Sequence, residues 1–362
     1  MFVEDLTMKL KTKNTTESLE HTRHWKFWLI TLTLALFVAI FLSLNLGYSS
    51  ISLESIFKIF LNKIPIVPNF NVSELESTLI LSIRLPRLLC AALVGAALSV
   101  AGVTYQGLFR NPLADPYTIG ASAGAALGAT TAIVLGISFT FLGLTSLPIF
   151  AFIGCILAVF LVYSISRVGT KVPVQTLLLS GIAVSIFLSA IVNYLQTIAP
   201  DKLHQSQFWL MGSFSYTEWT DIWSVVVFIF GGVIAIYLYS RDLNLLALGE
   251  TEAKHLGVEL EKVKKILLIS SAFITAAAVA ISGLIAFIGL IIPHLTRLLV
   301  GPDHRVLIPA SMLMGATFLM LCDSAARIIV APAELPVGII TAMCGGPFFL
   351  YLMRRKKKAD VS

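Results

Sequence analysis

The strongest constraint on the fold is the stretch from Arg84 to Gly128, in which two arginines precede about twenty uncharged residues. An apolar run of about twenty residues is long enough for one helix to cross the hydrocarbon core of a bilayer. The run ends in the turn from Asn111 to Pro116, and a second apolar run rich in small residues follows it. We therefore expect two membrane spans joined by a tight turn.

Three glycines recur at every fourth position after this turn, namely Gly120, Gly124 and Gly128. On one helix they would form a smooth face that lets a second helix approach closely, as small residues do in membranes. A flexible glycine linker is the alternative, but such linkers are rich in polar residues and this segment is rich in alanine. We interpret the three glycines as a helix-packing face.

Composition extends the membrane assignment to the whole chain. Of its 362 residues, 57% are hydrophobic and 13% are charged, and the mean hydropathy is +0.88. So few charges cannot cover the surface of a water-soluble protein of this size. The net charge of +6 does not indicate nucleic-acid binding, because the basic residues are scattered between apolar runs. The four cysteines are isolated in apolar runs, which predicts packing roles.

The apolar runs predict an all-α polytopic membrane protein with about ten transmembrane helices. A polar tail, residues 1–26, is expected to be loosely ordered. A transmembrane domain, 27–353, and a basic tail, 354–362, follow it. The expected spans cover residues 27–47, 85–109, 117–135, 147–166, 174–198, 219–239, 263–281, 284–300, 306–327 and 337–353. The boundaries between 263 and 300 are left open, because Pro293 interrupts this region.

Lysine and arginine positions set the expected orientation. With the N-terminus inside, about 20 of the 26 basic residues fall on the cytoplasmic side. Inverting the chain would reverse this bias and violate the positive-inside rule. Both termini are therefore expected to be cytoplasmic.

The sequence contains no recognisable catalytic, metal or cofactor site. It lacks GxxxxGK[ST], whose amides and lysine cradle phosphates, and it lacks HExxH. Its six histidines are spread along the chain, so no metal ligands are expected. An ion-coupled secondary transporter remains the alternative class, although the spans contain almost none of the buried acidic groups that ion coupling needs.

Two pairs of polar residues within the spans allow more than one role. Asp323 and Arg327 lie four residues apart, as in an ordinary helical ion pair. Asn193 and Gln196 lie one turn apart and either line a polar passage or bond neighbouring helices. The sequence favours neither role for the second pair.

Several motifs resemble the FecCD family, the permease subunits of bacterial ABC importers for iron-siderophores, haem and cobalamin. The matching segments are 84–87 (RLPR), 107–116 (GLFRNPLADP), 248–250 (LGE), 256–258 (LGV), 287–290 (FIGL), 293–294 (PH), 303–305 (DHR) and 334–338 (ELPVG). They occur in the family's order and are distributed along most of the chain, except for about the first eighty residues. The resemblance implies a type II ABC importer permease fold in the bacterial cytoplasmic membrane.

The resemblance also implies an activity and partners. The chain, itself no enzyme, would move an iron-siderophore inward, or in second place haem or cobalamin. Cytoplasmic ABC ATPase subunits would supply the energy, and an external substrate-binding protein would deliver the metal chelate. A second permease subunit, identical or related, would complete the passage. Membrane lipid would surround the chain, and no nucleic acid is expected.

A cytoplasmic loop, 241–262, resembles the family's coupling helix, which seats in a cleft of the ATPase. Its short helical stretch has acidic residues at the start and Lys254 and His255 near the end, which matches the helix dipole. An ordinary solvated loop is the alternative. The expected coupling residues are Gly249, Glu250, Ala253, Leu256 and Gly257.

Arg84, Arg87 and Arg327 are expected near the external ends of spans, against the general charge bias. Arginines at matching positions of the family receive acidic residues from the two lobes of the binding protein. The planar guanidinium suits this role because it holds a carboxylate with two bonds. Snorkelling of the side chains to lipid headgroups is the alternative.

Overall fold

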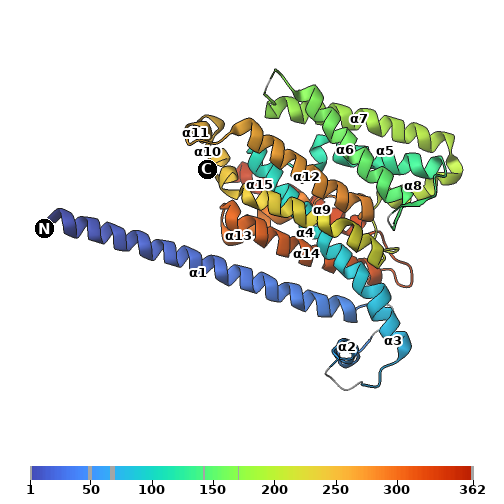
Figure 1. The fold of residues 1–362 in the computed structure, drawn as a ribbon. Helices are drawn as coiled ribbons and strands as arrows, with labels where there is room; N and C mark the ends of the chain where they lie inside the picture. The colour runs from blue at the N-terminus through green and yellow to red at the C-terminus, as the bar shows by residue number, and fades with distance from the viewer. Residues whose placement is uncertain (1, 48–50, 66–69, 142, 170, 360–362) are drawn as a thin grey trace.

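The structure, a computed structural model, describes residues 2–47, 51–65, 70–141, 143–169 and 171–359, which form a bundle of helices (Figure 1). The α-helices are α1 (Phe2–Asn45), α2 (Leu53–Leu61), α3 (Glu74–Thr78), α4 (Leu85–Phe109), α5 (Ala121–Val134), α6 (Ser146–Ser166), α7 (Val174–Ile198), α8 (Leu203–Leu210), α9 (Trp219–Leu238), α10 (Ser240–Leu248), α11 (Glu250–His255), α12 (Leu260–Ser282), α13 (Ile288–Val300), α14 (His304–Ile328) and α15 (Val337–Ala359). A π-helical segment, Leu79–Arg84, joins α3 to α4, and short 3₁₀ turns span Pro116–Ile119 and Pro200–Lys202. The strands β1 (Thr140–Phe141) and β2 (Leu144–Thr145) pair as one small antiparallel hairpin.

Among the residues that the structure describes, seven helical segments are long and apolar enough to cross a membrane. They are the second half of α1 from Arg23, the continuous segment Glu74–Phe109, and α6, α7, α9, α12 and α14. Three shorter apolar helices, α5, α13 and the first part of α15, lie where further spans were expected. The chain is therefore an all-α, multi-pass membrane protein, and the count of ten spans remains a prediction for the three short helices.

The buried centre of the bundle is α4, which contacts α9, α12, α13 and α14. Its side chains are buried almost without a break from Val94 to Phe109. Two glycines allow this close packing, because a Cβ on Gly95 would collide with the backbone of α14 and one on Gly102 with the backbone of α13. The helices therefore meet backbone to backbone, which small residues make possible inside a membrane.

The second glycine-rich segment agrees with the expected packing face only in part. Gly124 and Gly128 face α6, where an added Cβ would collide with the backbone at Gly154 and Phe150. Gly120 precedes α5 and has a φ of 85°. Gly120 is therefore the N-cap of α5 and not part of the helix, because the chain first forms the turn Pro116–Ile119 and needs a left-handed residue to enter α5. A Cβ at Gly120 would still lie 3.3 Å from Val162 of α6, so its packing role stays a prediction.

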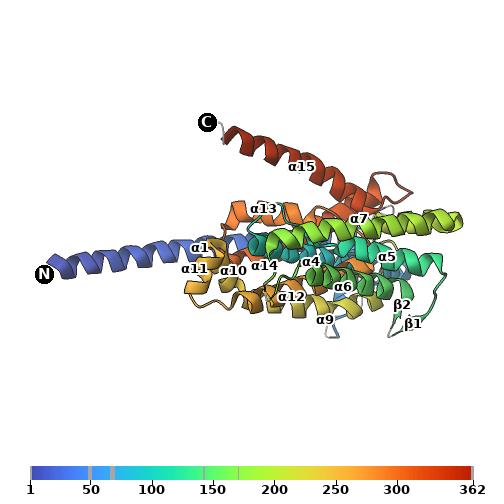
Figure 2. The same ribbon diagram turned by 90° about the horizontal axis from the view of Figure 1, so that it is seen from above.

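The N-terminal tail also differs from the expectation. Residues 2–26 continue α1 as one helix, and its first half projects beyond the bundle in both views (Figures 1 and 2). This segment contains neither proline nor glycine, the two residues that most disfavour a helix interior.

The region between 263 and 300 contains a break in the helical backbone. Residues 283–287 separate α12 from α13, which begins at Ile288 rather than at the expected Leu284. The Tyr117 hydroxyl donates to the carbonyl oxygen of Ile285 at 3.0 Å and accepts from its N–H at 3.1 Å. Non-helical backbone inside a membrane protein needs such internal partners because lipid offers none.

Candidate docking and coupling sites

The candidate docking arginines lie in one ion-pair network centred on Asp323 of α14. Arg87 of α4 donates from Nε to Asp323 at 2.9 Å and from Nη2 at 2.9 Å, so it grips the carboxylate with two nitrogens. Its third nitrogen, Nη1, donates to Glu334 at 2.7 Å. Arg327, one helical turn after Asp323, lies 3.4 Å from the same carboxylate and donates to the carbonyl oxygen of Ser43 at 3.0 Å. The two arginines thus bind α14 to α4 and α1.

Arg84 belongs to the same region but points to a different neighbour. It closes the π-helical segment before α4 and donates to the carbonyl oxygen of Leu44 at 2.6 Å. Arg84, Arg87 and Arg327 are 8%, 7% and 8% exposed. All three side chains are thus buried and held by internal acceptors in this conformation, and their expected docking role stays a prediction.

Glu334, on the loop before α15, is the most exposed member of the network. Its side chain is 39% exposed, and it also accepts a hydrogen bond at 2.9 Å from Ser215 on the loop before α9. Partial burial raises the pKa of Glu334, but hydrogen bonding to Arg87, the Arg87 charge and smaller effects of Ser215 and Arg327 lower it below its ordinary value. Glu334 is therefore an ionised carboxylate at the edge of a buried cluster.

Sequence reasoning missed the partners of Arg87. Asp323 and Glu334 lie 236 and 247 residues away along the chain, beyond any helical spacing rule. The available signal for Glu334 was its place at the start of the motif ELPVG, whereas Asp323 lies in no motif and stood out only by its spacing from Arg327. The expected Asp323–Arg327 pair is present, at 3.4 Å.

The candidate coupling segment has the expected local form. Between Gly249 and Gly257, whose φ angles are 142° and 89°, α11 runs from Glu250 to His255. Glycine adopts a positive φ at little cost. A positive φ is not helical, so the two glycines end the helix on each side and α11 stays short. In Figure 1, α10 and α11 lie at the end of the bundle that also carries both ends of the chain.

One face of this segment is anchored and the other is free. Ala253 is fully buried, and Glu250 pairs with Lys264 of α12 at 2.8 Å. Leu256 is 60% exposed, although it is a large apolar residue. The segment therefore presents an apolar side chain outward while an ion pair fixes it to a membrane helix.

Gln196 is tied to a neighbouring helix. It is 7% exposed, donates to Ser206 of α8 at 2.9 Å and accepts from Gln207 of α8 at 3.0 Å. Asn193, one turn earlier, is exposed. The structure thus favours helix–helix bonding for Gln196 and leaves Asn193 as the candidate passage residue.

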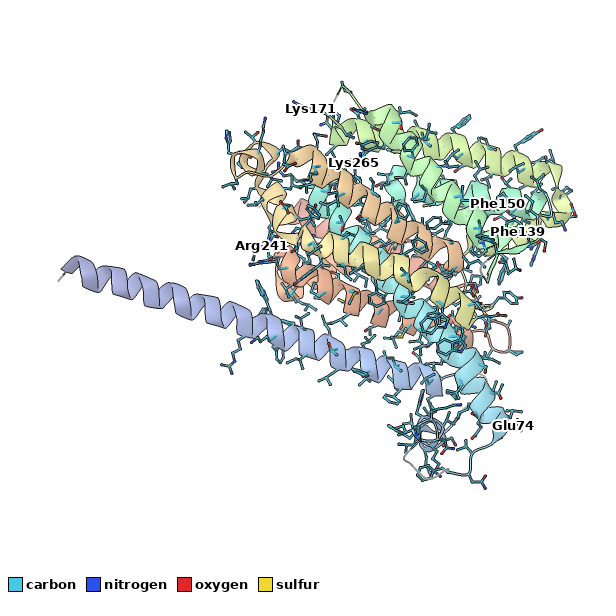
Figure 3. The ribbon with its side chains drawn as sticks, viewed as in Figure 1. Glu74, Phe139, Phe150, Lys171, Arg241 and Lys265 are labelled. Atoms are coloured by element: carbon cyan, nitrogen blue, oxygen red, sulfur yellow. The ribbon has the colours of Figure 1, made fainter. Side chains whose placement is uncertain are left out.

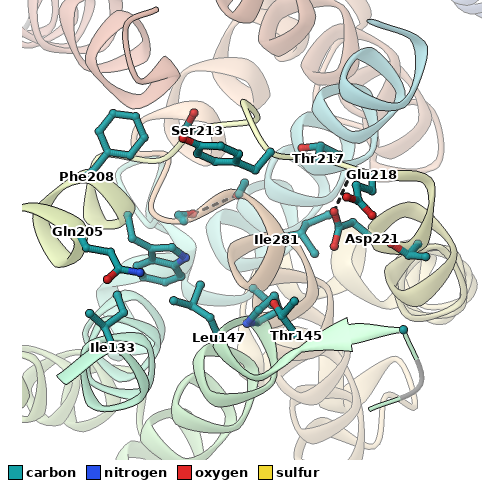
Figure 4. A pocket seen from close by; sticks show the side chains of 18 residues that line it. Ile133, Thr145, Leu147, Gln205, Phe208, Ser213, Thr217, Glu218, Asp221 and Ile281 are labelled. Atoms are coloured by element: carbon teal, nitrogen blue, oxygen red, sulfur yellow. Dashed lines mark hydrogen bonds between the residues drawn. The ribbon is translucent and has the colours of Figure 1, made fainter. Parts of the chain in front are cut away.

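A cavity of about 380 Å³ lies between α5, α6, α8, α9 and α12 (Figure 4). Its lining combines aromatic residues, including Phe208, with the carboxylates of Glu218 and Asp221. Those two carboxylates form the capping box of α9, in which the Glu218 N–H donates to Asp221 at 2.9 Å. Within the described ranges, no group of three His, Cys, Asp or Glu residues is placed to hold a metal ion.

This architecture defines a multi-pass helical membrane protein. Residues 35–355 match the model of the FecCD transport family, and the chain belongs to that family. It is 43% identical over 288 residues to the cobalamin import system permease protein of Halobacterium salinarum, covering 80% of this chain and 76% of that one. It is 45% identical over 280 residues to the hemin transport system permease protein of Yersinia pestis, covering 77% and 84%. It is 40% identical over 338 residues to the molybdate import system permease protein of Haemophilus influenzae, covering 92% and 97%.

A solved structure described as an inward-facing conformation of a metal-chelate type ABC transporter has the same fold. The TM-score is 0.77 at 36% identity, and the match covers 90% of this chain and 98% of that one. These relatives are permease subunits of ABC importers, which are transport components rather than enzymes.

Proposed function

We propose that the chain is the membrane-spanning subunit of an ABC importer that moves a metal chelate inward across the bacterial cytoplasmic membrane. The family match over residues 35–355 carries this proposal. Cobalamin, hemin and molybdate, the substrates in the names of three relatives, all contain a transition metal, and a fourth relative is named for iron chelatin. Within this class we propose an iron-siderophore as substrate, with haem and cobalamin next.

The proposed ATPase contact is the outer face of α10 and α11. The exposed Leu256 would enter an apolar part of the ATPase cleft, and the Glu250–Lys264 pair would carry a displacement of α11 to α12. In this proposal both termini and α11 face the cytoplasm, in agreement with the positive-inside distribution of charge. A second permease subunit would pair with this one around the passage.

The proposed contact with an external binding protein is the arginine cluster, with Glu334 acting as an internal competitor. Arg87 is already bound to two carboxylates, so an incoming carboxylate has to replace one of them. Glu334 is the accessible one, because Asp323 is 2% exposed and Glu334 is on a loop. Docking would therefore exchange Glu334 for an acidic residue of the binding protein, while Arg84 and Arg327 become available as α1 and α14 shift.

The test is reconstitution of the chain with its ATPase and binding protein in proteoliposomes. Uptake of a radiolabelled iron-siderophore is expected to require ATP, to stop with a non-hydrolysable ATP analogue, and to persist when ionophores remove proton and sodium gradients. Haem, cobalamin and molybdate serve as competitors that define the substrate. Uptake that follows an ion gradient without the ATPase would identify the chain as a secondary transporter instead.

A further inference from the structure

A groove of about 560 Å³ lies between α6 and α12. Its walls carry large apolar side chains that are exposed in the single chain, with Phe160 at 66%, Ile269 at 46% and Phe273 at 36%. Both helices are apolar enough to cross a membrane. The groove is therefore largely apolar, and it opens on a side of the bundle that lies within the membrane.

Polar groups in this groove are confined to one end. Arg167 follows the last residue of α6, and Lys265 lies in the second turn of α12. The remaining polar side chains of the lining, Tyr163 and Ser164, lie within the last turn of α6 next to Arg167. Figure 3 shows Lys265 at the same end of the bundle as Lys171 and far from Glu74. The groove thus has one basic end and an apolar remainder.

The two basic residues differ from their neighbours in lacking an acidic partner. Lys262 pairs with Glu259 at 3.5 Å and Lys264 with Glu250 at 2.8 Å. Among the residues that the structure describes, neither Arg167 nor Lys265 forms an ion pair, and Arg167 donates from Nε only to the carbonyl oxygen of Gly169, at 2.9 Å. Two cations free of carboxylates at the mouth of an apolar groove favour an anionic ligand.

The length of the groove fits one leaflet of a bilayer. The lining on α6 runs from Ile156 to Arg167, a helical rise of about 16 Å at 1.5 Å per residue. Half of a hydrocarbon core of about 30 Å is about 15 Å. A ligand whose charge lies at the headgroup level and whose chain reaches the bilayer centre would therefore fill it.

We propose that this groove binds an anionic phospholipid of the leaflet on the α10–α11 side. Its phosphate would contact Arg167 and Lys265, and one acyl chain would lie between α6 and α12 against Phe160 and Ile269. Basic pockets between transmembrane helices bind anionic headgroups in this way. The segregation of charge from apolar surface favours a lipid over a second copy of the chain. The proposal rests on membrane embedding and is independent of the substrate and direction of transport.

The experiment is native mass spectrometry of the purified full-length chain with phosphatidylglycerol or phosphatidylcholine of identical acyl chains. The wild type is expected to prefer phosphatidylglycerol. Arg167→Gln/Lys265→Gln should reduce that preference by roughly tenfold or more, since each cation near a headgroup contributes measurably to binding. Phosphatidylcholine binding should not change. Lys58→Gln/Lys63→Gln, which removes two cations from α2 and the turn after it, is the matched control and should keep the preference.

A second variant tests the apolar part of the site without altering charge. Ile269→Trp fills the groove and should reduce phosphatidylglycerol binding, and it also serves as the test if the charge variant does not fold. Unchanged lipid preference in both variants would overturn the proposal. So would inorganic phosphate competing fully with phosphatidylglycerol, because the cations would then bind phosphate alone. Crosslinking of Phe160→Cys between two copies, in a Cys344→Ser background, would show instead that the groove is a subunit interface.

Discussion

Asp323 is the residue that keeps two arginines inside the bundle. It is 2% exposed, and it faces Arg87 from α4 and Arg327 from its own helix. A buried ion pair contributes little beyond an apolar pair of the same shape, but removing one partner leaves an uncompensated charge in a low-dielectric interior. The fold should therefore depend more strongly on each charge of this cluster than on any exposed pair.

Arg87→Gln is expected to destabilise the folded chain by about 3–5 kcal/mol, the range for breaking a buried pair. The change removes the hydrogen bonds of the guanidinium to Asp323 and to Glu334. The measurement is the thermal unfolding midpoint of the purified protein in detergent. Lys58→Gln, which breaks the exposed pair with Glu54, is the control and should cost little. An unchanged midpoint for Arg87→Gln would show that the pair is not formed. Charge reversal at Arg87 would likewise disturb folding, so it cannot by itself test docking.

Glu334→Gln tests whether Glu334 competes with the binding protein. The variant removes a charge from Arg87 at the accessible edge of the cluster, so the affinity for the binding protein is expected to rise several-fold, most strongly at low salt where charge pairs are least screened. Because the pKa of Glu334 is lowered, its pairing is present above the ordinary glutamate pKa and is lost as pH falls through the lowered value. The wild type should therefore approach the variant's affinity in acid, provided the partner's own carboxylates remain charged. Weaker docking of the variant at neutral pH would rule out competition.

At the scale of elements, α5 and α6 pack through glycine. Gly124 of α5 and Gly154 of α6 lie against each other's backbones, and Gly128 lies against Phe150. Where these glycines meet, backbone packs against backbone, and van der Waals contact at this short distance stabilises the interface. Adding side-chain volume there forces the helices apart.

Gly124→Leu is expected to lower stability by about 1–3 kcal/mol or more, the cost of overpacking a filled interior. Folded yield and the thermal midpoint measure it. Gly231→Leu on α9 is the matched control, because a Cβ at Gly231 meets nothing within 4 Å. Equal stability of the two variants would show that α5 and α6 do not pack through Gly124.

At the scale of the whole molecule, α11 is connected to the centre of the bundle through α12. The Glu250–Lys264 pair links α11 to α12, and α12 in turn contacts α4, α6 and α9. A displacement of α11 by an ATPase would thus reach α12 and, through it, α4, α6 and α9. This path is the physical basis of the proposed coupling.

Glu250→Lys/Gly257→Pro is expected to leave the chain inserted and to abolish transport. Lysine at 250 would face the nearly buried Lys264, and proline cannot adopt the φ of 89° at Gly257 or donate its hydrogen bond to Lys254. Substrate-stimulated ATP hydrolysis by the assembled complex is the measurement. Glu259→Lys, a charge change at an exposed pair, is the control and should retain activity. Normal stimulated hydrolysis by the double variant would refute coupling through α11.

The sequence by itself determined the features that depend on neighbours along the chain. Apolar length located the helices that can cross a membrane, and the glycines at 249 and 257 located α11, because both signals are local. The motifs were sufficient to place the chain in its family.

Only the tertiary structure decided which distant groups meet. Arg87 is held by Asp323 and Glu334, more than 200 residues away, so its burial follows from the packing of α4 against α14. The Tyr117 hydroxyl supports the non-helical backbone at Ile285, which no periodicity predicts. In both cases a buried polar group needs a hydrogen-bond or ion-pair partner, and only the folded chain brings that partner close.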